Sequence, residues 1–125
     1  MQILIVEDHL DVLDCLRSYL EGKGHDTLTA STADEAIAWL DRSSPDMAFV
    51  DLLLARGHGR QVIQEISKRG LSSRMVVITA CDDLELRKEL LAHGVTNYLF
   101  KPVTIRDLDT LFTVTCPGSP ERPAA

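Results

Sequence analysis

The sequence predicts an α/β fold, a doubly wound five-stranded parallel sheet with helices on both of its faces. Short apolar runs of strand length alternate along the chain with segments in which apolar residues have helical spacing. The strands start near residues 3, 26, 47, 75 and 98, so each start follows the previous one by about one strand–helix unit. Five such units with right-handed crossovers form a doubly wound sheet.

Four of the predicted strands are continuous apolar runs, which are typical of parallel strands covered on both faces. They are Ile3–Val6, Met47–Val50, Met75–Ile78 and Tyr98–Phe100. The segment Thr27–Ala30 is more polar and alternates, so we expect it to form the fifth strand, at an edge of the sheet.

Five helical patterns fill the intervals between and after these strands, with apolar residues mostly three or four positions apart. Their apolar positions are Leu13, Leu16 and Leu20; Ala33, Ile37 and Leu40; Val62, Ile63 and Ile66; Leu84, Leu90 and Leu91; and Ile105, Leu108, Leu111 and Phe112. Thr32 and Glu35 have the spacing of a capping box at the second helix. Asp82 is expected to open the fourth helix, and Thr104 is expected to cap the fifth.

The length of the chain, 125 residues, fits one domain. The composition changes after Thr115, because three prolines fall within residues 116–125. We therefore expect a domain over residues 1–115, followed by a Pro-rich tail or the start of a linker over 116–125. The cysteines at positions 15, 81 and 116 are odd in number and widely spaced, which predicts neither a disulfide framework nor a CxxC metal site.

The charge of the chain argues against several classes of function. The formal net charge is −6, and an acidic surface repels polyphosphate, so we expect no direct binding of nucleic acid. No apolar run reaches about 18 residues, so no membrane-spanning helix is expected. The apolar start of the chain is too short for a secretory signal and has no basic flank. A soluble, cytoplasmic protein is the resulting prediction.

Polar residues follow four of the five predicted strands. Glu7 and Asp8 follow the first strand, Asp51 the third, Thr79 the fourth and Lys101 the fifth. The carboxyl ends of strands in a doubly wound sheet form the edge where ligands bind, so these side chains should meet there. Each of them alone could be an ordinary surface or turn residue, but their common position at strand ends favours a functional site.

The residue types in this group point to phosphoryl chemistry. Three carboxylates and one ammonium leave a net negative charge, which fits a hard divalent cation such as Mg²⁺. A carboxylate can also act as a nucleophile toward phosphorus. Lysine and a threonine hydroxyl are suitable donors to phosphoryl oxygens. The sequence therefore indicates phosphoryl transfer assisted by Mg²⁺.

The chain resembles the receiver domain of bacterial two-component response regulators, the chemotaxis-regulator-like proteins, from Ile3 to about Thr115. The resemblance rests on the order of the acidic pair, the later Asp, Thr-Ala and Lys-Pro at the strand ends. Gly59, eight residues after the Asp, and Tyr98, three residues before the Lys, also match. The resemblance implies the flavodoxin-like strand order 2-1-3-4-5.

The same resemblance implies roles for the site residues. Asp51 would be the phosphoacceptor. Mg²⁺ would be held by Glu7, Asp8, Asp51 and the backbone carbonyl of Leu53. Lys101 would pair with Asp51 and then with the phosphoryl group.

Further roles concern the switch. Thr79 would donate a hydrogen bond to the phosphoryl group, and Tyr98 would change rotamer in response. A tyrosine on an edge strand is also common as an ordinary packing residue, so its switch role depends on the resemblance alone. Pro102 would follow a cis peptide bond.

The resemblance implies a signalling switch rather than a metabolic enzyme, one that catalyses only its own phosphorylation and dephosphorylation. A sensor histidine kinase or phosphotransfer protein would supply the phosphoryl group. The face made by the fourth helix, fifth strand and fifth helix would then control a partner or an output domain, or form a homodimer.

Two other functions fit the sequence less well. A receiver-like protein-binding module would act without phosphorylation, but such modules lose residues that this chain keeps. A haloacid-dehalogenase-like phosphatase would need a DxD motif after the first strand, where this chain has Glu7-Asp8-His9.

The loop after the third strand departs from the family pattern. Leu54-Ala55 stands where the family often has Met-Pro or Leu-Pro, and Gly57 follows. Loss of proline and gain of glycine predict a more mobile loop. Leu53 and Cys81 occupy the positions that flank the path of the hydrolytic water in similar domains. Neither can orient a water, and Leu53 adds bulk, so a long-lived phosphoryl group is expected.

Overall fold

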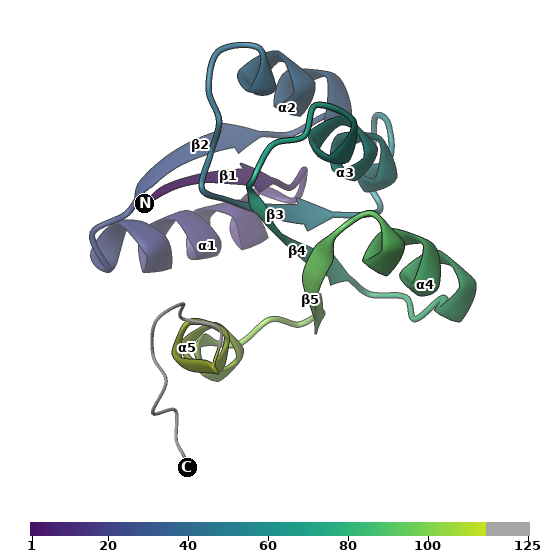
Figure 1. Ribbon diagram of the computed structural model, residues 1–125. Coiled ribbons are helices and arrows are strands. Elements are labelled where there is room, and N and C mark those ends of the chain that lie inside the picture. Colours follow the sequence, from purple (N-terminus) through teal and green to yellow (C-terminus); the bar gives the residue numbers. More distant parts are fainter. Residues whose placement is uncertain (115–125) are drawn as a thin grey trace.

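The computed structural model describes residues 1–114 of the chain, so the Pro-rich segment expected at 116–125 lies outside the described residues. Strands and helices alternate along the chain (Figure 1). They are β1 (Gln2–Val6), α1 (Leu10–Gly22), β2 (Asp26–Ala30), α2 (Ala33–Leu40), β3 (Met47–Asp51), α3 (Gly59–Lys68), β4 (Arg74–Thr79), α4 (Leu84–Ala92), β5 (Val95–Phe100) and α5 (Ile105–Val114).

The five strands form one parallel sheet in the order β2-β1-β3-β4-β5, which confirms the predicted fold class and strand order. The more polar strand β2 lies at one edge, as its alternating pattern predicted, and β5 lies at the other. In the register of the sheet, Val6 lies beside Val50, Asp51 beside Ile78 and Thr79 beside Phe100. This register brings the carboxyl ends of the strands to one edge.

Helices cover both faces of the sheet and enclose two apolar layers (Figure 1). Alternate residues of β1 point to opposite faces, with Leu4 in one layer and Ile5 in the other. The layer that contains Leu4 is closed by α2, α3 and α4, and the layer that contains Ile5 is closed by α1 and α5. The strands are buried on both sides, which is why they read as continuous apolar runs.

The ends of several elements differ from their sequence-based prediction. Strand β5 begins at Val95 rather than at Tyr98, because backbone pairing with β4 extends over polar residues that carry no apolar signal. Helix α4 is capped by Asp83, whose side chain accepts from the Leu86 N–H, and not by Asp82. Ile105 was assigned to the apolar face of α5 but is 60% exposed.

The predicted caps of α2 and α5 form in different ways. The Thr32 hydroxyl accepts the Glu35 N–H as expected, and the Glu35 carboxylate accepts hydrogen bonds from the backbone and side chain of Ser31. At α5 the Thr104 hydroxyl accepts the Asp107 N–H, and the Asp107 carboxylate accepts the Thr104 N–H. The reciprocal pair fixes the chain directly after β5, next to the site.

Gly59, the first residue of α3, allows the backbone to pass close to the end of β3. A Cβ atom at this position would lie 2.3 Å from the Asp51 carbonyl oxygen and 2.8 Å from the Leu52 Cα. The Gly59 N–H also donates to the Leu52 carbonyl at 2.9 Å. The close approach therefore holds the start of α3 against the backbone of Asp51, the residue predicted to accept the phosphoryl group.

Within residues 1–114, no helix has both the length and the apolar character needed to cross a membrane.

The close approach at Gly59 predicts a stability effect. We expect Gly59→Ala to lower the free energy of unfolding by about 2 kcal/mol or more, because backbone atoms must move to admit the methyl group. The matched control is Gly22→Ala, where a Cβ atom would meet nothing within 4 Å, and stability should stay equal or rise by up to about 1 kcal/mol. Urea denaturation of both variants measures the difference, and equal stabilities would contradict the packing argument.

Candidate functional site

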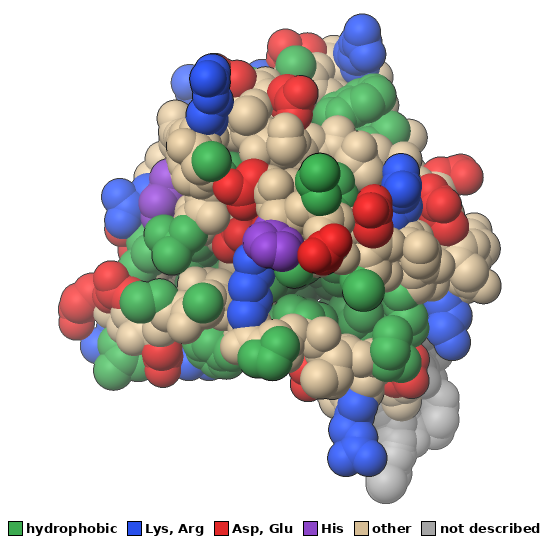
Figure 2. Space-filling view, turned by 180° about the vertical axis from the view of Figure 1, so that it is seen from behind, with side chains coloured by type: hydrophobic (Ala, Val, Ile, Leu, Met, Phe, Trp, Pro, Cys, Tyr) green, Lys and Arg blue, Asp and Glu red, His purple; other side chains and the backbone are tan. Residues whose placement is uncertain are grey.

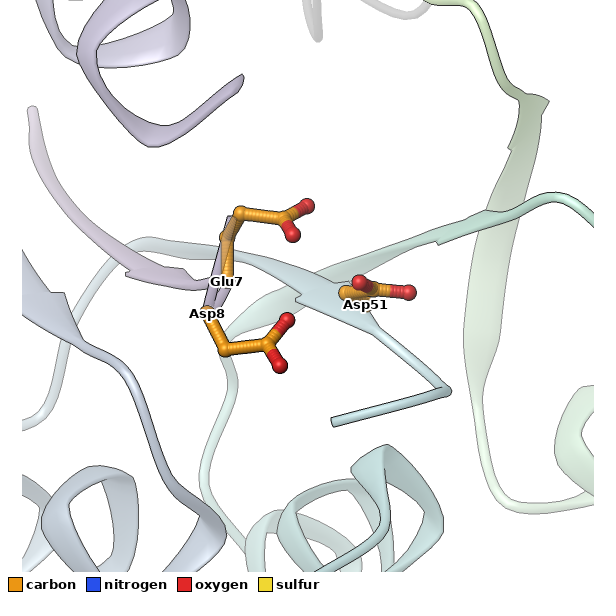
Figure 3. A group of neighbouring side chains, drawn as sticks. All are labelled: Glu7, Asp8 and Asp51. Atoms are coloured by element: carbon orange, nitrogen blue, oxygen red, sulfur yellow. The ribbon is translucent and has the colours of Figure 1, made fainter. Parts of the chain in front are cut away.

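The site lies where four strands end at the same edge of the sheet. Glu7 and Asp8 directly follow β1, and Asp51 is the last residue of β3. Thr79 is the last residue of β4, and Lys101 follows β5. Figure 3 shows the carboxylates of the first three residues gathered at this edge. The structure thus brings together the residues that the sequence analysis placed at strand ends.

A lysine bridges the two most buried carboxylates. The Lys101 Nζ lies 3.0 Å from the Asp51 Oδ2 and 3.2 Å from the Glu7 Oε1. Glu7 is completely buried and Asp51 is 3% exposed, whereas the lysine side chain is partly exposed. Charges this deeply buried are costly unless they are paired, so the ammonium is needed to keep both carboxylates inside the fold.

One ammonium does not compensate two buried carboxylates, and the pKa of Glu7 reflects this. Burial is the largest cause, and the neighbouring Asp51 carboxylate adds to it; together they raise the pKa of Glu7 from 4.5 to about 7. The hydrogen bonds from the His9 N–H and from Lys101 act in the opposite direction. Burial alone would lower the pKa of Lys101, but its hydrogen bond to Asp51 and the two nearby negative charges raise it.

The three carboxylates form a group that fits a divalent cation. Glu7, Asp8 and Asp51 each offer an oxygen, and these oxygens lie within 4.8 Å of one another. The Glu7 Oε1 is buried and accepts no hydrogen bond among the described residues, although the Lys101 ammonium lies 3.2 Å from it. Three carboxylates with a single ammonium beside them form an all-oxygen donor set with excess negative charge, which is the environment that Mg²⁺ prefers.

The β3–α3 loop, residues 52–58, lies against this acidic group. The Leu53 N–H donates to the Asp51 Oδ1 at 3.2 Å, and the Leu53 side chain is exposed. The Ala55 N–H donates to the Asp8 Oδ2 at 2.7 Å. Both backbone donors direct their hydrogens at carboxylates of the site, so the loop forms one wall of it.

The residues that follow β4 and β5 complete the site. The Thr79 hydroxyl shares two hydrogen bonds of 3.1 Å with the Cys81 backbone, one as donor and one as acceptor. The Lys101 N–H donates to the Thr79 carbonyl at 2.9 Å, which ties the ends of the two strands together. The Lys101–Pro102 peptide bond is cis.

Tyr98 lies on β5, with its ring packed against the apolar layer under α4. Its hydroxyl oxygen is buried and has no hydrogen-bond partner among the described residues. The guanidinium of Arg87 on α4 lies 5.1 Å from the centroid of the Tyr98 ring and 5.7 Å from that of Phe100. Arg87 therefore covers both aromatic residues of β5 from the outside.

A groove of about 680 Å³ opens beside the site, between α1 and α5, and its wall is mostly apolar. Lys101 and His9 lie at its end next to the acidic group, and Ile105 and Val12 form part of its apolar wall. In Figure 2, acidic, basic and histidine side chains meet near the centre of the face, with hydrophobic side chains directly below them.

Three contributions to the site were missed by the sequence analysis. The Nδ1 of His58, a residue to which the sequence analysis gives no role, accepts the Arg60 N–H and caps α3. The Ala55 backbone donor has no signal in its side chain. Arg87 sits in the helix with the weakest amphipathic pattern, and its contact with Tyr98 depends on how α4 lies over β5, which sequence spacing does not give.

Comparisons with known proteins show the family of the chain. The family model described as "Response regulator receiver domain" matches residues 3–113. The alginate biosynthesis transcriptional regulatory protein AlgB of Pseudomonas aeruginosa is 33% identical over 101 residues, which are 81% of this chain and 22% of that protein. The alkaline phosphatase synthesis transcriptional regulatory protein PhoP of Bacillus subtilis is 30% identical over 109 residues, 86% of this chain and 45% of that protein. The chain thus spans less than half the length of these two relatives.

Solved structures show the same likeness. A response regulator receiver domain protein (CheY-like) from Methanospirillum hungatei is 30% identical, with a TM-score of 0.79 and coverage of 86% of both chains. A two-component response regulator from Clostridium difficile is 25% identical, with a TM-score of 0.80 and coverage of 88% of this chain and 90% of that one. The family model and the fold agree, and the chain belongs to the response regulator receiver domains of two-component systems.

Proposed function

We propose that this receiver domain is a phosphorylation-dependent switch that accepts a phosphoryl group on Asp51 from a histidine kinase or phosphotransfer protein. The single observation that carries the proposal is the buried Asp51 carboxylate in contact with Lys101, beside two further carboxylates that fit a cation. In the reaction, a carboxylate oxygen of Asp51 forms a bond to phosphorus while the bond between phosphorus and the donor's imidazole nitrogen breaks.

The side chains around Asp51 have separate tasks in this proposal. Lys101 holds the Asp51 Oδ2, and after transfer its ammonium pairs with the phosphoryl group. Glu7, Asp8 and Asp51, whose carboxylate oxygens lie close together, would hold Mg²⁺ with the help of the Leu53 carbonyl. The ion would neutralise negative charge on the transferring group. The Leu53 N–H fixes the other oxygen of Asp51, so the nucleophile enters the reaction in a set orientation.

The groove between α1 and α5 supports docking of the phosphodonor. It opens at Lys101, so a donor histidine carried on a partner helix could reach Asp51 while apolar side chains of that helix fill the groove. Ile105, 60% exposed at the start of α5, supplies apolar surface on this side. An exposed apolar surface next to a reactive residue is typical of a partner contact.

The output face is proposed to be α4, β5 and α5. Thr79 would turn from the Cys81 backbone to donate a hydrogen bond to the phosphoryl group, and Tyr98 would respond by a change in packing. This face exposes apolar side chains at Leu91 and Phe100, which are 50% and 40% exposed. A partner, an output domain or a second copy of the domain could bury them.

The proposal extends to the cellular location and the output of the domain. The domain would act in the cytoplasm, where its kinase transfers phosphate. The two relatives are described as transcriptional regulatory proteins, and a comparable output would require a further segment, since residues 1–114 form the receiver fold alone. A module that binds partners without phosphorylation is the second candidate, and the retained carboxylates and lysine argue against it.

The central experiment is phosphorylation by a small donor. Incubation with Mg²⁺ and acetyl phosphate should add the mass of one phosphoryl group, and peptide mapping should place it on Asp51. Asp51→Asn should abolish the addition, because the nucleophile is lost, whereas Asp41→Asn, at an exposed position, should leave it unchanged. A phosphoryl group that persists in Asp51→Asn would overturn the assignment.

The buried Glu7 predicts a dependence of stability on pH. In the folded protein Glu7 keeps its proton up to about pH 7, whereas in the unfolded chain it loses the proton near pH 4.5. Folding stability therefore falls as the pH rises through this window. At pH 8 without divalent cations, we expect Glu7→Gln to raise the free energy of unfolding by about 1–3 kcal/mol, because it removes a buried charge. The gain should disappear as the pH falls toward 4.5.

The control for this effect is Glu35→Gln. Hydrogen bonds from the Ser31 backbone and side chain lower the pKa of Glu35, so ionised Glu35 favours folding and its replacement should not stabilise the protein. Urea denaturation at pH 5 and pH 8 in EDTA measures both variants. The argument fails if Glu7→Gln is no more stable than the wild type at pH 8.

The residues beside the reacting atoms predict a slow loss of phosphate. Neither Leu53 nor Cys81 can orient a water for in-line attack, and both are exposed at the site. We expect the double variant Leu53→Asn with Cys81→Glu to shorten the lifetime of the phosphoprotein by about tenfold or more. Phosphate release from purified phosphoprotein measures it, with Leu91→Asn as a control on a distant helix. An equal or longer lifetime in the double variant would contradict the prediction.

A further inference from the structure

One backbone hydrogen bond joins the β3–α3 loop to the acidic pair. The Ala55 N–H donates to the Asp8 Oδ2 at 2.7 Å, across 47 residues of sequence. The Ala55 side chain is exposed and takes no part in the contact. The contact depends on an amide hydrogen at position 55, which every residue except proline supplies.

The loop is held in place on both sides of Ala55. On one side, the Leu53 N–H donates to the Asp51 carboxylate. On the other, the Arg56 carbonyl accepts the Ala33 N–H at 3.3 Å, and Gly57 has φ +82°, with space for a Cβ blocked by Ala33 at 2.7 Å. The Ala55 amide is therefore directed at Asp8 by a loop with its own anchors.

A charge-assisted hydrogen bond of this length fixes the orientation of the Asp8 carboxylate before a cation binds. Lys101 contacts Glu7 and Asp51, while the partner that the structure gives to Asp8 is the Ala55 amide, which donates a hydrogen bond. The amide fixes one oxygen of a carboxylate that also belongs to the group with Glu7 and Asp51. A carboxylate already held in position loses less rotational freedom when a cation binds.

We propose that the Ala55 amide is a positioning donor for Asp8, so that cation binding and the conformation of the β3–α3 loop are thermodynamically coupled. The inference rests on the proposed cation site. Hydrogen-bond partners of metal ligands orient them and support affinity, and here that partner belongs to the loop. Linkage then works in both directions: the amide favours the cation, and the cation strengthens the contact between the amide and Asp8.

The coupling has a consequence for the chemistry of the site. The same loop carries Leu53, whose amide holds the Asp51 carboxylate and whose side chain is exposed. A cation that tightens the Ala55 contact also reduces the motion of Leu53. Binding of a cation would thus reduce the motion of the β3–α3 loop, which would shield the phosphoryl group.

The first test removes the amide hydrogen. Titration with Mg²⁺, followed by NMR shifts of Glu7, Asp8 and Asp51, gives the dissociation constant of each variant. Ala55→Pro should weaken Mg²⁺ binding by about tenfold, as loss of a ligand's hydrogen-bond partner does elsewhere. Ala55→Gly keeps the amide and should change the constant much less. Equal constants for Ala55→Pro and Ala55→Gly would overturn the inference.

The second test uses the wild-type protein and does not depend on how the proline variant folds. Hydrogen exchange of the Ala55 amide should slow by about tenfold at saturating Mg²⁺, the reciprocal of the effect on affinity. Unchanged or faster exchange while Mg²⁺ binds would overturn the inference and leave the cation site intact. If Mg²⁺ shifts none of the three acidic residues, the proposed cation site itself fails, and the inference fails with it.

Discussion

The ammonium of Lys101 between two buried carboxylates is the interaction on which the rest of the site depends. Glu7 and Asp51 are almost inaccessible to water, and without a cation beside them neither charge could be kept inside the sheet edge. The fold satisfies this requirement by parallel pairing. Because β1, β3 and β5 run in one direction, their carboxyl ends meet, and residues far apart in the chain come within 3.0–3.2 Å. The apolar strands matter for function because they fix those ends.

One ammonium does not balance the two buried carboxylates, and the resulting destabilisation is consistent with a site for a cation. A pKa of about 7 for Glu7 shows that the carboxyl group is poorly stabilised as an anion by the protein alone. An apolar residue in its place would remove the penalty but also the oxygen that a cation needs. In the proposed function, the missing positive charge would come from a bound cation, which would also neutralise the negative charge of the incoming phosphoryl group. The electrostatics of the site make sense as a binding site and not as a device for stability.

The sequence was sufficient for the architecture because its signals were local and repeated. The sheet was predicted from five strand–helix units and four apolar runs, and the residues at its edge from the polar residue after each of four strands. The strand order was predicted from the family resemblance. The sequence was insufficient where the contact is made by backbone or by a helix approaching from elsewhere. The amide of Ala55 and the guanidinium of Arg87 are such cases. Asp82 and Asp83 are adjacent and chemically identical, so only the backbone geometry decides which of them caps α4.

The packing of Tyr98 suggests why the far side of the sheet could respond to events at Asp51. Its hydroxyl is buried without a partner among the described residues, which costs about 1–3 kcal/mol. Burial of the ring and the Arg87 guanidinium 5.1 Å from it offset that cost. In the proposed switch, these opposing contributions would let the tyrosine exchange between inward and outward positions. The β4–β5 ladder places Tyr98 beside Val77, two residues before Thr79, so a shift of the threonine toward a phosphoryl group acts on neighbouring backbone. If Tyr98 acts as this switch, a change of a few kcal/mol at Thr79 would be enough to move its population.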